Sequence, residues 1–140
     1  MQSFQKICDH QGISLAIIIR VDYSAEKTNF FSNPEYSQQV GIIKYPLGGK
    51  IKPHYHNELS RQVVFTQEVL VIRNGTVKVD LYSSTLEWVD SIVLDKGDVI
   101  FLISGGHGFE MMEDCEMLEI KQGPYSGVGN DKTHFAGKGS

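Results

Sequence analysis

The chain has 140 residues, a formal net charge of −4 at pH 7 and a pI near 5.7. This length suits one domain with a sizeable core, and the acidic balance excludes a nucleic-acid partner because no basic stripe is present to neutralise phosphates. No apolar stretch reaches the length of a membrane span, so we expect a cytoplasmic protein with no membrane partner. Cys8 and Cys115 lie far apart in the sequence, and we expect both to be free thiols.

The first half of the chain predicts strands separated by loops that are rich in turn residues. The first strand is expected over 13–21, where the apolar run 13–19 fits a core strand better than a signal peptide. The polar segment 22–39 is interpreted as a loop or arm. Strands over 40–45 and 51–56 follow it.

The second half predicts a denser series of strands. Residues 68–73 and 76–82 form the clearest expected hairpin, because Asn74-Gly75 supplies the two positive-φ residues that a type I′ turn needs. Further strands are expected over 87–94, 98–103, 107–112 and 115–121. The tail over 122–140 either folds over the barrel mouth as a lid or is disordered beyond about residue 130.

The periodicity therefore predicts one all-β domain over 1–140. No helical period of apolar residues is sustained anywhere in the sequence, and about nine or ten strands are expected. The simplest architecture for such a chain is a double-stranded β-helix, the jelly roll.

The most distinctive chemical pattern is His54-Tyr55-His56, followed by Glu68 and later by His107. Residues i and i+2 of a strand lie on one face, so His54 and His56 can point at one shared atom while Tyr55 faces away. Three imidazoles and a carboxylate are a suitable first shell for a divalent transition metal, and a bound cation offsets the cost of burying them. Fe, Mn, Ni, Zn and Cu all stay open, and scattered surface histidines are the alternative.

The glycines around these residues carry a family resemblance. Gly48-Gly49 precede the histidine pair, six residues separate Glu68 from Gly75, and Gly97 begins a segment that ends in Gly105-Gly106-His107. This arrangement resembles the two-motif signature of the cupin superfamily. The resemblance implies a jelly-roll fold, described as a cupin-like barrel, with His54, His56, Glu68 and His107 as metal ligands.

Three departures from the cupin pattern affect these assignments. Eleven residues separate His56 from Glu68 instead of three or four, so the connection must be longer than usual. Glu58 is a rival carboxylate, but Glu68 is preferred for its spacing to Gly75. Ile103 replaces the proline of the second motif, and the spacing from Gly97 to His107 is one residue short.

A closer resemblance covers nearly the whole chain. The segments 65–70, 105–110 and 119–125 resemble those of small single-domain cupins, a group associated with surface-polysaccharide and sugar-nucleotide gene clusters. This resemblance implies carbohydrate biosynthesis and a sugar or sugar nucleotide as the small-molecule ligand. A fold-level likeness does not by itself define a reaction.

Four further side chains are candidates for binding a substrate. Arg61 and Lys44 could hold a carboxylate or phosphate, with solvated surface charge as the alternative. Tyr45 could donate a proton or stack on a sugar, and Phe109 lies on the face of His107. The expected cavity lining, with ordinary core packing as the alternative, is Leu70, Ile72, Phe101, Phe109 and Met111.

Three functions are compatible with these residues. The first is a metal-dependent enzyme that acts on a small polar molecule, of the isomerase, epimerase or dioxygenase type. The second is a non-catalytic module that binds a metal or small ligand, and the third is a cupin that works without metal. Because the apolar run 13–19 would be an exposed edge strand, we also predict a homodimer.

Overall fold

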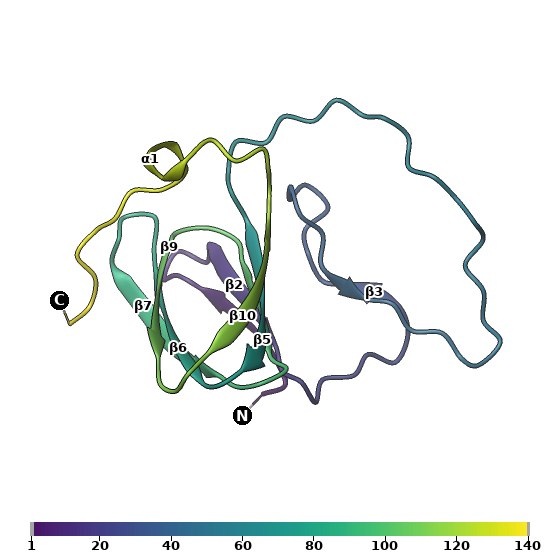
Figure 1. The fold of residues 1–140 in the computed structure, drawn as a ribbon, viewed down its shortest axis with the longest axis horizontal. Coiled ribbons are helices and arrows are strands. Elements are labelled where there is room, and N and C mark those ends of the chain that lie inside the picture. Colours follow the sequence, from purple (N-terminus) through teal and green to yellow (C-terminus); the bar gives the residue numbers. More distant parts are fainter. Residues whose placement is uncertain (1, 140) are drawn as a thin grey trace.

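Antiparallel β-strands are the main regular elements of the structure, a computed structural model that describes residues 2–139 (Figure 1). The larger sheet has the strand order β1 (Phe4–Cys8), β2 (Ser14–Ile19), β8 (Val99–Leu102), β5 (Glu68–Asn74) and β10 (Glu116–Lys121). The smaller sheet has the order β7 (Trp88–Leu94), β6 (Val77–Tyr82) and β9 (Gly106–Met111). A two-stranded ribbon, β3 (Asn29–Phe30) and β4 (Gly41–Ile42), and one helical turn, α1 (Val128–Asp131), complete the elements. The all-β fold class is confirmed.

The main hydrophobic core lies between the two sheets. Strand β6 shows the alternation clearly, because Val77, Val79 and Leu81 are fully buried while the residues between them are only half-buried. Leu70 and Ile72 of β5 face the same core from the larger sheet. A second cluster lies on the outer face of the larger sheet, where segment 31–40 packs on it; its buried members are Ile17, Ile19, Phe101 and Ile103.

A buried ion pair ties the two sheets together on one side. Arg20, just after β2, donates from Nη1 to Asp98 Oδ2 at 2.9 Å and to the Val93 carbonyl of β7 at 2.6 Å. The same carboxylate accepts hydrogen bonds from the backbone N–H groups of Val21 and Asp95. On the opposite side β9 and β10 are the edge strands of their sheets, so the described residues form a sandwich that is not closed into a barrel.

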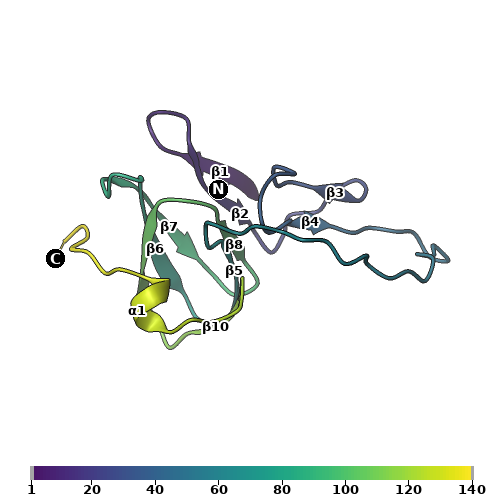
Figure 2. The ribbon, with the colours of Figure 1, turned by 90° about the horizontal axis from the view of Figure 1, so that it is seen from above.

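A long segment projects from this sandwich. Residues 43–66, called the projecting loop below, are exposed without exception and contain no strand (Figures 1 and 2). The prediction of a strand over 51–56 is therefore wrong for this structure, and the strand expected over 40–45 shrinks to β4. A strand needs a neighbouring edge for its hydrogen bonds, and none lies beside the projecting loop in either view.

The predicted hairpin around Asn74-Gly75 is also corrected. Strands β5 and β6 exist, but β5 pairs with β8 and β10 while β6 pairs with β7 and β9. Both edges of each strand are occupied, so the turn carries the chain from one sheet to the other. Gly75 has φ +84°, but Asn74 does not have a positive φ, so the turn is not type I′.

Both terminal segments contact the sheets in this structure. Strand β1 is absent from the strands predicted above and pairs with β2, which also pairs with β8, so the run 13–19 is not the exposed edge strand on which the homodimer prediction was based. The tail folds back on the smaller sheet: the Phe135 ring lies 5.0 Å from the Tyr82 ring, and Lys138 Nζ lies 3.7 Å above the Trp88 ring. Ser140, the last residue of the expected tail, lies outside the described residues. Both cysteines are free, and within 2–139 no helix is long and apolar enough to cross a membrane.

Candidate functional site

Two of the predicted site residues meet at the open side of the sandwich. Glu68 begins β5 in the larger sheet and His107 lies in β9 of the smaller sheet, yet Glu68 Oε2 and His107 Nε2 are 3.6 Å apart. Their side chains are 13% and 30% exposed, so solvent reaches them only partly. The inward alternation of both strands explains the contact, because Glu68 shares its face with Leu70, and His107 pairs with inward-facing Leu81.

Burial changes the acidity of the Glu68 carboxyl. Its pKa is raised from 4.5 to about 7, first by burial and then by the charge and hydrogen bond of neighbouring Glu119. Lys121 and Lys132 oppose this change and lower the Glu68 pKa. A carboxyl with a pKa near neutrality can both accept and release a proton at physiological pH.

Burial has the opposite effect on His107. It lowers the imidazole pKa, and the positive charge of Lys132 lowers it further. His107 is therefore neutral at pH 7, and its contact with Glu68 is not an ion pair at that pH. A neutral imidazole has one nitrogen free to accept a proton or to bind a metal.

Three charged residues near this pair were not among the predicted site residues. Glu119 and Lys121 lie on β10, opposite Leu70 and Glu68, and Lys132 comes from the tail. On β10 the inward face carries Met117, Glu119 and Lys121, while Leu118 and Ile120 face outward and are about half exposed. From the sequence alone, Leu118 and Ile120 would be placed on the inward face, because they are apolar. The register with β5 shows instead that Glu119 and Lys121 face inward.

His54 and His56 lie elsewhere. Both are exposed on the projecting loop, with their ring centroids 5.3 Å apart, and His54 Nδ1 is 2.8 Å from the Lys52 carbonyl oxygen. No three His, Cys, Asp or Glu side chains among residues 2–139 are grouped closely enough to hold a metal ion. One copy of the described chain thus brings together two of the four predicted ligands. The rival carboxylate Glu58 is also on the projecting loop.

The predicted substrate-binding residues are dispersed. Tyr45 and Arg61 are exposed on the projecting loop, and Lys44 at its base donates from Nζ to the Ser24 hydroxyl and the Ala25 carbonyl. Phe109 does lie beside the site, with its ring centroid 5.6 Å from that of His107. Phe109 also packs against the main core.

The predicted cavity lining needs one correction. Leu70 and Ile72 are buried in the main core, whereas Phe101 is on the opposite face of the larger sheet. Phe101 pairs with Val69, and the register therefore turns both side chains outward. Met111, at the end of β9, is half exposed.

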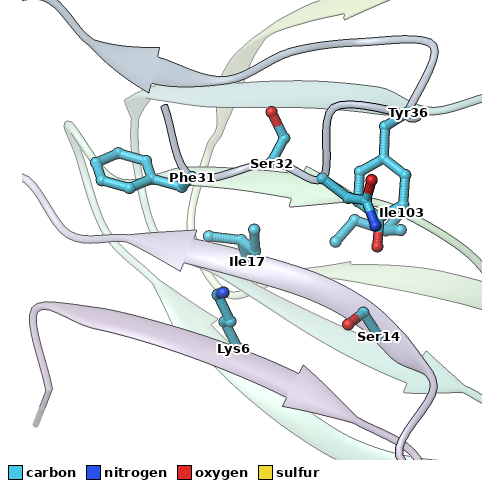
Figure 3. A pocket seen from close by; sticks show the side chains of 8 residues that line it. Lys6, Ser14, Ile17, Phe31, Ser32, Tyr36 and Ile103 are labelled. Carbon is cyan, nitrogen blue, oxygen red and sulfur yellow. The ribbon is translucent and has the colours of Figure 1, made fainter. Parts of the chain in front are cut away.

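Two hollows lie on the outer face of the larger sheet, away from the Glu68–His107 pair. Figure 3 shows one of about 270 Å³, where Lys6 and Ile17 on the strands face Phe31, Ser32 and Tyr36 of the overlying segment. The other, of about 450 Å³, lies between the β3–β4 ribbon and the edge of the larger sheet; it is lined by Phe30, Gln38, Gln39, Val40, Gly41, Ile43, Val69 and Ile120. Lys6 is the one charged residue among those that line the first hollow.

Fold and site together define an open antiparallel β-sandwich with a partly buried acid–imidazole pair at its open side. Comparison with protein-family models, with curated proteins and with solved structures gave no match to this chain.

Proposed function

We propose that this chain is a cupin-like jelly-roll enzyme that acts on a small polar molecule, a sugar or sugar nucleotide, at the Glu68–His107 pair. The observation that carries the proposal is the 3.6 Å contact between these two side chains, which come from different sheets and are partly withdrawn from water. A half-buried acid and a neutral imidazole are the two group types that most often move protons in enzymes. Perturbed pKa values of this kind are typical of functional sites.

The residues around the pair suggest a role for each group. Glu68, with a pKa near 7, takes a proton from a carbon or hydroxyl of the ligand and returns it to a neighbouring atom. His107 Nε2 accepts a hydrogen bond from a ligand hydroxyl or assists that transfer. Lys132 places positive charge beside the pair, which favours a phosphate-bearing or acidic ligand, whereas Lys121 is paired with Asp131 at 3.3 Å.

The donor set agrees in part with the expected divalent transition metal. The Glu68 carboxylate and neutral His107 are suitable ligands, but two protein ligands do not make a firm site. His54 and His56 complete a three-imidazole, one-carboxylate shell only if a projecting loop docks over the pair. The ion would supply Lewis-acid polarisation of a ligand oxygen.

Elemental analysis of the purified protein beside His54→Ala and His107→Ala tests the metal part of the proposal. We expect near-stoichiometric transition metal in the parent and its loss in both variants. Iron would favour oxygen chemistry, and zinc or nickel would favour isomerisation. Absence of metal after reconstitution with each candidate ion would overturn the metalloenzyme.

A second candidate is a metal-free isomerase or epimerase, favoured by the pKa of Glu68 near 7 next to a neutral imidazole. Exchange of ligand protons with deuterated water, measured by NMR in a chelator, would support it over the metalloenzyme. A non-catalytic module that binds a metal or small ligand would show no proton exchange and no turnover, either with metal or in the chelator.

A further inference from the structure

The projecting loop exposes an unusual amount of apolar surface. All 24 residues from 43 to 66 are exposed, and Leu47, Tyr55 and Phe65 keep 106%, 86% and 77% of their possible surface. The large apolar side chains that it exposes are Ile43, Tyr45, Leu47, Ile51, Tyr55, Leu59, Val63, Val64 and Phe65. Exposed apolar surface of this amount favours an interaction site.

The sandwich offers a matching surface on its open side, which the tail covers only at one end, where Asp131 pairs with Lys121 of β10 and the Phe135 ring lies against Gly106 of β9. Strand β10 is one outer strand of the larger sheet and β9 one outer strand of the smaller sheet, whose other edges in the described residues are β1 and β7, and a short turn over 112–115 joins β9 to β10. Each outer strand has a row of backbone groups that can pair with an added strand. Met111, Leu118 and Ile120 are about half exposed along these edges, and Ile120 lines the hollow of about 450 Å³.

The two surfaces carry opposite charge. The projecting loop contains Lys44, Lys50, Lys52 and Arg61 against a single acid, Glu58. The segment 106–121, which holds β9 and β10, contains five acids against a single base, Lys121. Two of these acids, Glu110 and Glu116, pair with Lys78 and Arg73 of neighbouring strands, so the excess negative charge comes from Glu113, Asp114 and Glu119. Such complementarity steers association and selects the docked orientation.

The sequence of the projecting loop suits an added strand that pairs with a neighbour through only one of its own two edges. In extended form, residues 51–56 place Lys52, His54 and His56 on one face, and Ile51 and Tyr55 on the other. Pro53 has no N–H and is tolerated only in a strand whose outer edge stays free. An added strand beside β9 has such a free outer edge.

We propose that the projecting loop of each copy docks on the open β9–β10 side of a second copy, so that two chains exchange loops. The occupant is a second copy because the loop leaves next to the β3–β4 ribbon and extends away from its own sandwich in both views (Figures 1 and 2). Reciprocal exchange buries both loops in one closed two-fold dimer. A loop of 24 residues is within the usual size of about 20–30 interface residues per partner.

The exchange has a consequence for the site, and this part rests on the proposed function. On the inward face of the added strand, His54 and His56 would lie next to the partner's Glu68 and His107. Each metal site would then contain residues of both chains. The incomplete ligand set in one copy, noted above, is the expected result.

Light scattering and cross-linking test the exchange without reference to metal. We expect a species of twice the 15.7 kDa chain mass. Proteins labelled with ¹⁴N and ¹⁵N are mixed in the unfolded state, refolded together and treated with a zero-length carbodiimide cross-linker. The cross-linker should join Lys50 or Lys52 to carboxylates of 106–121. The joined peptides should include pairs in which one peptide carries ¹⁴N and the other ¹⁵N. A monomer in light scattering would overturn the proposal. Cross-links found only between peptides of the same isotope would also overturn it, because they mean that the loop folds onto its own sandwich.

Complementation tests the shared site. Two double variants are needed, one with His54→Ala/His56→Ala and one with Glu68→Gln/His107→Ala, and neither is expected to bind metal alone. Their co-expression should restore about a quarter of the parental metal content. Half of the dimers are then hybrid, and each hybrid has one intact site out of two. The matched control combines His54→Ala/His56→Ala with the chain that carries all four substitutions, which gives no intact site. Hybrid cross-links without restored metal would support the exchange and reject the shared site. If the parent protein itself binds no metal, the proposed metalloenzyme is rejected. The cross-linking result then decides whether the loops are exchanged.

Discussion

Glu68 on β5 and His107 on β9 lie 3.6 Å apart at the side where the two sheets are not joined. The buried pair of Arg20 and Asp98 holds the opposite side together. The sandwich therefore has one side that is fixed by a buried charge network and one side that presents polar, titratable groups. This asymmetry places the candidate site where a ligand or an added chain segment can reach it.

The raised pKa of Glu68 predicts how the stability of the metal-free protein depends on pH. The unfolded chain releases this proton near pH 4.5 and the folded chain near pH 7, so the folded state binds more protons between these values. The contribution of Glu68 to the free energy of unfolding should therefore fall as pH rises from about 5 to 8, by at most about 3 kcal/mol, while the lowered pKa of His107 adds an opposing contribution that rises with pH up to about 6.5. Urea denaturation across this range, in a chelator, measures the change. Glu68→Gln should remove the falling contribution and leave the rising contribution of His107, and an unchanged slope in that variant would contradict the assignment.

The tail residue Lys132 should influence both members of the pair. Its positive charge lowers the pKa of His107 and of Glu68, so Lys132→Gln should raise both values. The His107 ring protons, followed by NMR from pH 4 to 8, give the first value directly. Lys138→Gln is a suitable control, because Lys138 lies above Trp88 and is not among the charges that act on either group. An unchanged His107 titration in Lys132→Gln would show that the tail does not lie beside the site.

Much of the fold could be predicted from alternation alone. The sequence locates β5 and β6 within one residue because their apolar residues alternate, and it locates β2 within two residues from its continuous apolar run. Strand β10 is also located within one residue, although its apolar residues Leu118 and Ile120 face outward. The sequence was less informative about which strands pair with one another. The Asn74-Gly75 turn is typical of a hairpin, yet here it joins strands of two different sheets. Which edge a strand pairs with depends on all the other strands, and a local turn signal does not contain that information.

The candidate site was predicted in part for the same reason. Glu68 and His107 come together because each lies inside a regular strand whose inward face is fixed by burial. His54 and His56 also have strand spacing, but the spacing defines a face only when a neighbouring strand is present. Lys132 acts through the fold of the tail, for which its sequence gives no periodic signal.

The turn at Gly75 gives a further prediction. Gly75 has φ +84°, and a Cβ there would overlap the backbone oxygen of Asp114 and the thiol of Cys115, 2.7 Å away. Gly75→Ala should therefore destabilise the fold by about 3 kcal/mol or more, from backbone strain plus steric overlap. Gly12→Ala is the matched control, because its φ is +80° but no atom lies within 4 Å, and about 1 kcal/mol is expected. Thermal and urea denaturation compare the two, and equal losses would refute the close approach of the 112–115 turn.

The buried pair at the closed side of the sandwich gives the largest expected effect. Asp98→Ala leaves the Arg20 guanidinium buried without its carboxylate and removes the acceptor of the Val21 and Asp95 N–H groups. Breaking such a pair typically destabilises a protein by about 3–5 kcal/mol. Glu116→Ala breaks an ion pair of similar length with Arg73, 3.0 Å, but both of its side chains are more than half exposed, so less than about 1 kcal/mol is expected. If urea denaturation gave the same small loss for both variants, the Arg20–Asp98 network would not be what holds the β2 and β7 side of the sandwich closed.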